Sequence, residues 1–169
     1  MMGVVCLIFF VVTSAFLGFV LTKVPFVQTR SADIELVVKK LKMQKDQKFI
    51  DLGSGDGKVC FIVHKLSGAV CVGYELTWWT HLLAKLRALK FKKKVNFYNK
   101  NFFKVSWTET DYVYGYLYPP LMGKIEEKFL KECKPGSIAI IRDFPFPNLI
   151  PEEKMFLPGK HEIYIYLHK

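Results

Sequence analysis

An acidic, glycine-rich run is the part of the sequence best suited to chemistry. It comprises Asp51-Leu52-Gly53-Ser54-Gly55-Asp56-Gly57 and begins at the end of a short apolar stretch. Its glycines permit a tight strand-to-helix turn in which a ligand can approach bare backbone. A second apolar stretch ends at Glu75-Leu76, where an acidic side chain can hold ribose hydroxyl groups. The two features together predict a nucleotide-type cofactor site, and therefore an enzyme.

The spacing of the glycines narrows the choice of ligand. A dinucleotide-binding turn has the pattern G-x-G-x-x-G and a phosphate loop ends in Lys-Ser/Thr, whereas this run is acidic-x-G-x-G-x-G. The carboxylates of Asp51 and Asp56 would repel a pyrophosphate. S-adenosyl-L-methionine carries a sulfonium and an ammonium and no phosphate, so it suits an acidic turn. The pattern resembles motif I of the class I methyltransferases. The alternative is a glycine turn that merely joins a strand to a helix.

Length and composition indicate one domain of ordinary size. The chain has 169 residues and a net charge of +10 at pH 7. Its four cysteines and four histidines lack metal-ligand spacing, so no metal site is predicted. We expect the cysteines to be reduced and mostly buried, in a protein that faces the cytosol.

The first 22 residues differ from the rest of the chain. They contain no charged side chain, and a helix of that length would cross a bilayer core of roughly 30 Å. The sequence thus predicts a transmembrane anchor at 1–22, a juxtamembrane segment and helix at 23–48, and a catalytic domain at 49–169. A cleaved signal peptide is the alternative.

The orientation of this predicted anchor follows from the charges beside it. Seven basic residues lie between 23 and 48, whereas none precedes the span. The positive-inside rule then predicts a single-pass membrane protein with a cytoplasmic catalytic domain and with bilayer lipid as a partner. A bacterial inner membrane is favoured, and a mitochondrial inner membrane if the source is eukaryotic.

Apolar runs alternate with amphipathic segments along the remaining chain. The pattern predicts strands at 48–52, 69–75, 95–98, 111–117 and 137–141, with helices at 31–41, 59–66, 78–90 and 121–132. Two further strands, at 154–157 and 162–167, flank Pro158-Gly159 as a hairpin. This order predicts an α/β fold of five β-α units, with a mostly parallel Rossmann-like sheet, helices on both faces and an antiparallel end.

Five short segments together suggest a family. They are Pro25-Phe26-Val27-Gln28-Thr29, Asp51 to Lys58, Gly73-Tyr74-Glu75-Leu76, Tyr118-Pro119-Pro120 and Phe144-Pro145-Phe146-Pro147. In these segments the chain, from Val24 to its end, resembles the small membrane-anchored class I methyltransferases that include the mitochondrial lysine methyltransferases of the ATP synthase c subunit and the adenine nucleotide translocase. The resemblance implies a seven-strand methyltransferase sheet, S-adenosyl-L-methionine as cofactor, and a lysine on a membrane-associated protein as methyl acceptor. The chain departs from the family pattern at Gln28, Trp78 and Leu149.

The expected donor site combines these features. We expect Asp51 to bind the methionine ammonium, Gly53, Gly55 and Gly57 to offer backbone, and Glu75 to bind the ribose. We expect Asn101 to meet the adenine amino group and Phe102 to lie against the ring face, the alternatives being a turn residue and a core residue. The matching segments add to the predicted cofactor contacts Thr29, Ser54 and Leu76.

The expected acceptor site lies at the end of the fourth strand, where ligands gather in open α/β sheets. Methyl transfer is an in-line displacement that needs positioning more than a strong nucleophile. Tyr118 and Pro119 are the predicted catalytic residues. Desolvation among Tyr114, Tyr116 and Tyr118 could keep an acceptor lysine neutral, the alternative being that one face of this strand is core.

Two other functions fit the sequence less well. One is a methyltransferase of RNA or of a small molecule or lipid, for which the basic run 90–94 would serve nucleic acid. Anionic lipid is the nearer polyanion for that run if the chain is anchored, so a nucleic-acid partner is not expected. The other is a non-catalytic membrane-tethered binding module, against which the intact glycines and Glu75 argue.

Overall fold

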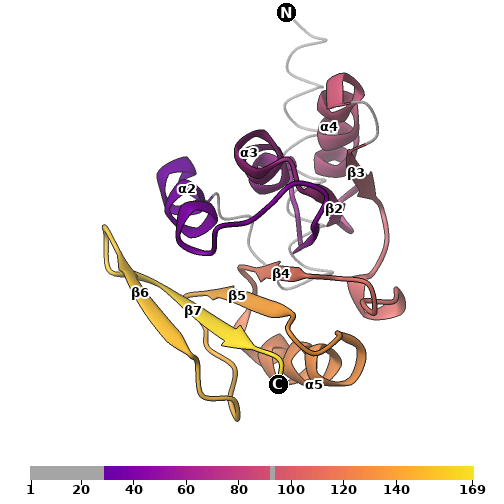
Figure 1. The fold of residues 1–169 in the computed structure, drawn as a ribbon. Helices are drawn as coiled ribbons and strands as arrows, with labels where there is room; N and C mark the ends of the chain where they lie inside the picture. Colours follow the sequence, from indigo (N-terminus) through magenta and orange to yellow (C-terminus); the bar gives the residue numbers. More distant parts are fainter. Residues whose placement is uncertain (1–28, 92–93) are drawn as a thin grey trace, which may run out of the picture.

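The computed structural model of the protein describes residues 29–91 and 94–169 (Figure 1). Seven strands form one sheet in the order β3-β2-β1-β4-β5-β7-β6. They are β1 (Lys48–Leu52), β2 (Val70–Tyr74), β3 (Val95–Tyr98), β4 (Tyr112–Gly115), β5 (Ile138–Arg142), β6 (Glu153–Leu157) and β7 (His161–Leu167). Strands β1 to β5 are parallel, while β7 pairs antiparallel with β5 and with β6. The predicted sheet, with its antiparallel ending, is therefore present.

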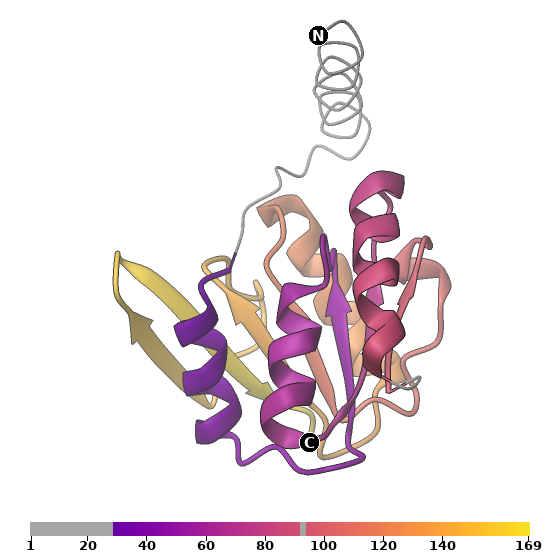
Figure 2. The ribbon, with the colours of Figure 1, turned by 90° about the horizontal axis from the view of Figure 1, so that it is seen from above.

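The two faces of the sheet are covered differently. Helices α2 (Ser31–Lys40), α3 (Lys58–Ser67) and α4 (Trp78–Ala88) lie on one face, and α5 (Met122–Glu132) lies on the other (Figure 2). The first face buries one cluster of apolar side chains under α2 and α3, and the second buries another under α5. Successive side chains of a strand point to opposite faces of the sheet, so one strand contributes to both clusters. Ile140, for example, belongs to the first cluster and Ile141 to the second.

The prediction of five β-α units is wrong at two connections. An α-helix follows β1, β2 and β4, but β3 is followed by the short 3₁₀ turn η2 (Phe102–Lys104) and β5 by the irregular segment 143–152. Proline explains the second case, because Pro145 and Pro147 lack amide hydrogens and disfavour helix in the residues before them. In place of these helices, Phe102, Trp107 and Phe146 fill the second face.

The predicted transmembrane helix must be removed from the fold class. Within residues 29–91 and 94–169, none of the helices has both the length and the apolar character needed to cross a bilayer. The predicted span, 1–22, lies outside the described residues. The single-pass topology that rested on it is likewise unsupported, and the fold class is a seven-stranded mixed α/β sheet.

Two buried polar contacts fasten the beginning of the described chain to the sheet. The hydroxyl groups of Thr29 and Tyr114 lie 3.0 Å apart, and an Arg142 nitrogen donates to Asp33 at 2.7 Å. Both members of the Asp33–Arg142 ion pair are almost fully buried. These contacts join α2 and the chain just before it to β4 and β5, next to the strand that leads into the glycine turn.

Candidate functional site

The glycine turn connects β1 to α3 at the carboxyl edge of the sheet. Gly53, Gly55 and Gly57 have φ values of +75°, +52° and +83°, which only glycine adopts without strain. The amides of Gly53 and Ser54 both donate to the carbonyl of Tyr74, at 2.9 and 3.1 Å. The turn is therefore held against the end of β2, and it lies beside β4, where the strand order reverses and open α/β sheets bind ligands.

Close packing under the turn also requires glycine. A Cβ atom at Gly73 would lie 2.5 Å from both the Phe97 ring and the Ser54 hydroxyl oxygen. At Gly57 it would lie 2.4 Å from the same ring. Because neither glycine has a side chain, the Phe97 ring can pack directly against the turn.

Glu75 lies against the glycine turn, as the sequence predicts. One carboxylate oxygen accepts from the amide of Gly55 at 2.8 Å, and the other accepts from the amide of Thr77 at 2.7 Å. The Asn99 side chain donates to the carbonyls of Glu75 and Leu76, at 2.7 and 2.9 Å. Each carboxylate oxygen has a second lone pair, so it can also accept from a ligand hydroxyl. Asn99 was not predicted, and its place just after β3 is the one signal that could have suggested it.

Asp51 is a buried carboxyl group directly before the turn. Its side chain is only 2% exposed, and the Cys60 thiol donates to it at 3.8 Å. Burial, reinforced by the negative charge of Glu75, raises the pKa of Asp51 to about 8. A cation placed beside Asp51 would favour the ionised form. Contact of Asp51 with a positively charged ligand group stays a prediction.

The carboxylate of Asp56 has different partners from the carboxyl group of Asp51. One of its carboxylate oxygens accepts from Arg87 of α4 at 2.6 Å, and the other accepts from the amide of Lys58. The charge of Asp56 is thus balanced within the protein. Of the acidic side chains in this part of the sequence, Asp51 and Glu75 are the ones that the structure gathers at the turn.

Asn101 and Phe102 have structural roles in the described chain. The Asn101 amide oxygen accepts from the amide of Phe103 at 2.9 Å and so caps η2. The Phe102 ring is almost fully buried, with its centroid 4.5 Å from that of Phe103 and 6.5 Å from that of Trp107. The turn and core interpretations therefore have direct support, while contact of either residue with adenine stays a prediction.

The three tyrosines at the end of β4 do not share one environment. Tyr114 is buried beside Thr29, and burial raises its pKa above the usual range. The Tyr116 ring stacks on Phe144 with centroids 6.4 Å apart. Tyr118 is exposed and begins the 3₁₀ turn η3 (Pro119–Leu121). Of the predicted channel, only the outer part, with Tyr116 and Tyr118, is open to an acceptor.

The ion pair between Asp33 and Arg142 was not predicted from the sequence. Arg142 ends an otherwise apolar strand, and a charge in that position normally signals a buried partner. The partner lies 109 residues earlier in the chain, so spacing gave no indication of it. The pair matters to the site because it holds α2, whose apolar residues pack in one core cluster with Tyr114, the partner of Asp51 in the β1–β4 ladder.

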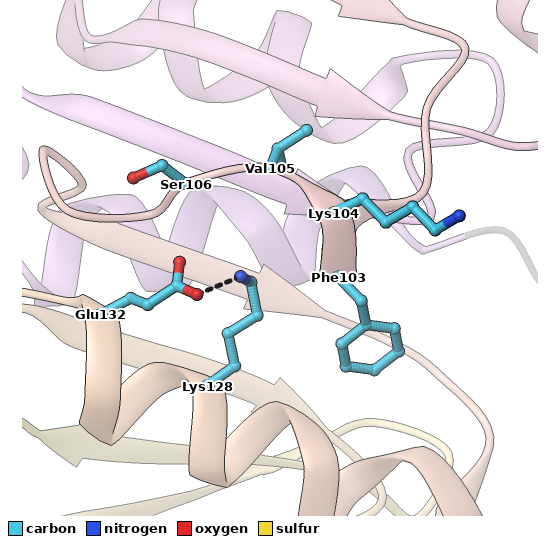
Figure 3. Close-up of a pocket in the computed structure, with 6 residues that line it drawn as sticks. All are labelled: Phe103, Lys104, Val105, Ser106, Lys128 and Glu132. Carbon is cyan, nitrogen blue, oxygen red and sulfur yellow. Dashed lines mark hydrogen bonds and ion pairs between the residues drawn. The ribbon is translucent and has the colours of Figure 1, made fainter.

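A surface depression of about 340 Å³ lies elsewhere (Figure 3). Its lining consists of Phe103, Lys104, Val105, Ser106, Lys128 and Glu132, and it includes none of the predicted site residues. Lys128 and Glu132 form an ion pair there, and the Lys128 ammonium also lies 5.1 Å from the centre of the Trp107 ring. Because these charges already satisfy each other, the depression offers little to a ligand.

Three cysteines lie in the described chain, and all of them are buried thiols: Cys60, Cys71 and Cys133. Burial raises the pKa values of Cys60 and Cys133, which keeps these thiols protonated and unreactive. Among residues 29–91 and 94–169, no three His, Cys, Asp or Glu side chains are arranged to hold a metal ion.

Solved structures with the same fold include methyltransferases. The RNA methyltransferase from Salinibacter ruber, in complex with S-adenosyl-L-homocysteine, superposes with a TM-score of 0.78 at 23% identity, covering 84% of this chain and 94% of that one. A SAM-dependent methyltransferase from Thiobacillus denitrificans, also with S-adenosyl-L-homocysteine, gives 0.58 at 22% identity, covering 65% and 47%. At this level of identity, the likeness establishes the fold.

Sequence relatives are more specific. The lysine N-methyltransferase of the ATP synthase c subunit from Rattus norvegicus is 33% identical over 147 residues, which cover 85% of this chain and 67% of that protein. The protein of the same name from Homo sapiens is 32% identical, covering 76% and 55%. The adenine nucleotide translocase lysine N-methyltransferase of Mus musculus is 30% identical, covering 76% and 57%. The chain thus spans between about half and two thirds of the length of these relatives.

A family model gives the assignment. The ANTKMT methyltransferase domain matches residues 51–153, from Asp51 of the glycine turn into β6. The predicted family is confirmed, and with it the predicted enzyme class, an S-adenosyl-L-methionine-dependent methyltransferase. The chain belongs to the ANTKMT methyltransferase domain family.

Proposed function

We propose that the protein is a protein-lysine N-methyltransferase that uses S-adenosyl-L-methionine as methyl donor. The observation that carries this proposal is the bond between the Glu75 carboxylate and the Gly55 amide, which holds Glu75 against the glycine turn next to the buried Asp51. The names of the curated relatives support lysine as the acceptor. The first acceptors to test are lysines of the two proteins that these names give, the ATP synthase c subunit and the adenine nucleotide translocase.

Different residues bind different parts of the donor. Asp51 faces the methionine ammonium, Glu75 accepts from the ribose hydroxyls, and the backbone of Gly53, Ser54, Gly55 and Gly57 lines the turn between them. Leu76 lies beside the ribose, and Thr29 closes the methionine end through its bond to Tyr114. Asn101 and Phe102 border the adenine end. When bound, the donor supplies an activated methyl group, so the protein has to position both reactants and exclude water.

The acceptor approaches at the end of β4. Tyr118 and Pro119 are exposed there, and the stacked pair Tyr116–Phe144 lies at the ends of β4 and β5. Exclusion of water around the acceptor disfavours its ammonium form, so burial of the amine between these rings and the donor promotes the neutral amine that attacks the methyl carbon. The acceptor ammonium first loses one proton to water. The neutral lysine nitrogen then forms the new bond to that carbon while the bond from carbon to sulfur breaks, which yields S-adenosyl-L-homocysteine and a methylated lysine that stays protonated at neutral pH.

Calorimetry of donor binding tests the first half of this proposal. The wild-type chain is expected to bind S-adenosyl-L-methionine at one site, and Glu75→Ala is expected to weaken binding about tenfold or more, because it removes charge-assisted hydrogen bonds. Glu127→Ala, at an exposed position of α5, is the control and should leave the affinity unchanged. Thermal unfolding shows whether each variant is folded. Failure of the folded wild-type chain to bind the donor would end the proposal.

Transfer to a lysine tests the second half. The chain is incubated with methyl-labelled donor and with membranes that contain the candidate acceptor proteins, and mass spectrometry locates the label. Label on a lysine nitrogen supports the assignment. Label in RNA or in a lipid fraction, with protein unlabelled, would replace lysine by one of the other acceptor classes while leaving the donor site intact.

A further inference from the structure

Helix α4 presents its large apolar side chains to solvent. Four of them, at positions i, i+4, i+8 and i+11, share one face of α4 and of the following 3₁₀ turn η1 (Leu89–Phe91) and form what we call the α4 stripe: Trp78, Leu82, Leu86 and Leu89. Their exposed fractions are 50%, 47%, 58% and 80%. The residues of α4 that are buried instead are the small Thr80 and Ala84.

This arrangement reverses the usual amphipathic pattern. A surface helix normally turns its large apolar residues to the core, and a contiguous exposed apolar patch marks a site of contact with another molecule or a membrane. The small inner residues let α4 approach the sheet closely, so they account for the inner face. They do not account for the stripe, which adds nothing to the core.

Most of the charges that the sequence places around the stripe are positive. Between Glu75 and Glu109 the sequence contains eight basic residues and no acidic residue. Within this stretch Arg87 and Lys94 are paired with Asp56 and Asp46, both of which lie earlier in the chain. Lys85 and Lys90 are exposed beside the stripe. The surface is thus apolar at its centre and cationic at its rim.

The apolar centre and the cationic rim of this surface together favour one kind of binding partner. A second copy of the chain would bring cation against cation, which opposes association. A nucleic acid would pair with the lysines but would leave the tryptophan and leucines in water. An anionic lipid surface satisfies both, because apolar side chains enter the boundary between headgroups and acyl chains while lysines meet the phosphates.

We propose that α4 docks on an anionic lipid surface through the α4 stripe, with Lys85 and Lys90 against the headgroup phosphates. The docking face begins one residue after Thr77, whose amide is bound by Glu75. It therefore starts at the donor site. This peripheral contact needs no membrane-spanning element and is independent of whether the acceptor is a lysine.

Tryptophan fluorescence tests the contact in the full chain. The sequence has three tryptophans, of which Trp78 and Trp79 lie on α4 while Trp107 is fully buried in the core under α5. Vesicles of phosphatidylcholine and phosphatidylglycerol with brominated acyl chains quench only indole rings that enter the lipid. We expect quenching with these vesicles, weaker quenching with phosphatidylcholine alone, and none in Trp78→Phe/Trp79→Phe, in which Trp107 remains.

Leucine variants test whether binding to vesicles depends on the α4 stripe or on exposed leucines anywhere on the surface. Leu82→Ser/Leu86→Ser/Leu89→Ser is expected to lower the affinity of the chain for the anionic vesicles, read from the quenching, about tenfold or more, since three exposed leucines are removed. The control, Leu66→Ser/Leu130→Ser/Leu167→Ser, changes three exposed leucines of α3, α5 and β7, which lie outside the stripe, and should quench like wild type. Donor affinity and melting temperature establish that each variant is folded.

Three results would overturn the proposal. One is vesicle-bound chain whose tryptophans are unquenched, which would mean that protein, such as the segment 1–28, covers the stripe instead. Another is equal quenching with neutral and anionic vesicles. The third is equal loss in the stripe variant and in the control variant.

Discussion

At the scale of single residues, the protonation of Asp51 is expected to control donor binding. Burial and the charge of Glu75 raise the pKa of Asp51 to about 8 in the ligand-free protein, so this carboxyl group is mostly protonated at pH 7. An ammonium group requires the carboxylate. Binding must therefore release a proton wherever the pH lies below about 8.

The expected result is a pH-dependent affinity. Between pH 8 and pH 6, donor affinity should fall about tenfold for each unit of pH. It should also fall above about pH 8, because the α-ammonium of the donor then loses its own proton. Calorimetry in two buffers of different ionisation enthalpy should detect a net release of protons on binding at pH 7 and a net uptake at pH 9. An affinity that is flat from pH 6 to pH 9 would contradict this account of Asp51.

The variant Asp51→Asn separates binding from stability. Because the folded-state pKa of Asp51 lies above its unfolded value, its protonated form stabilises the fold at low pH, and this contribution is lost as the pH rises through about 8. At pH 8 the variant should therefore unfold no more easily than wild type in urea, although it binds the donor weakly and without the loss of affinity below pH 8. Glu127→Gln serves as the control for both measurements.

The sequence indicates which residues lie at the glycine turn, but it does not indicate all of the hydrogen bonds and ion pairs that they and their neighbours form. Glycine and acid spacing indicated Asp51 and Glu75 because both follow directly from a strand-turn-helix pattern. The orientation of Asp56 depends on Arg87, 31 residues later, and the bond of Arg142 depends on Asp33, 109 residues earlier. Contacts at such separations are set by how helices pack on the sheet, and local pattern does not contain them.

At the scale of elements, the junction of β2 with the glycine turn depends on the missing side chain of Gly73. In Gly73→Ala the new Cβ would overlap the Phe97 ring and the Ser54 hydroxyl, so we expect a loss of about 1–3 kcal/mol in the free energy of unfolding. Gly123→Ala in α5 is the matched control, since its Cβ would meet its nearest neighbour at 3.7 Å, and alanine favours helix by up to about 1 kcal/mol. Urea denaturation measures both, and equal changes would refute the steric argument.

Connections were harder to predict than strands. Apolar runs located all seven strands, since buried strands leave a strong local signal. The segments after β3 and β5 were assigned to β-α units because helices usually cover both faces of a parallel sheet. Trp107 and Phe146 cover the second face instead, and single bulky residues of this kind leave no periodic pattern to detect.

At the scale of the whole molecule, the Asp33–Arg142 pair joins α2 to the far half of the sheet. Asp33→Ala would leave the buried Arg142 charge with its longer contact of 3.8 Å to Asp143, and the expected cost is about 1–3 kcal/mol of unfolding free energy. Glu35→Ala, at an exposed position on the same helix, should cost less than about 0.5 kcal/mol. Replacing both members of the pair, as Asp33→Leu/Arg142→Met, should recover much of the loss. A single variant no worse than the Glu35 control would show that the pair does not hold α2.

The strand order divides the chain into two halves that meet between β1 and β4. Within the first half β1, β2 and β3 pair in sequence order, whereas the ladder from β1 to β4 joins residues such as Phe49 and Tyr112, 63 positions apart. Closing so long a loop is slow, so this seam should form late in folding and open early in unfolding. The glycine turn lies at the seam. A donor molecule bound there would hold the two halves together and lengthen the lifetime of the native state by a factor that grows with the ratio of free donor concentration to Kd.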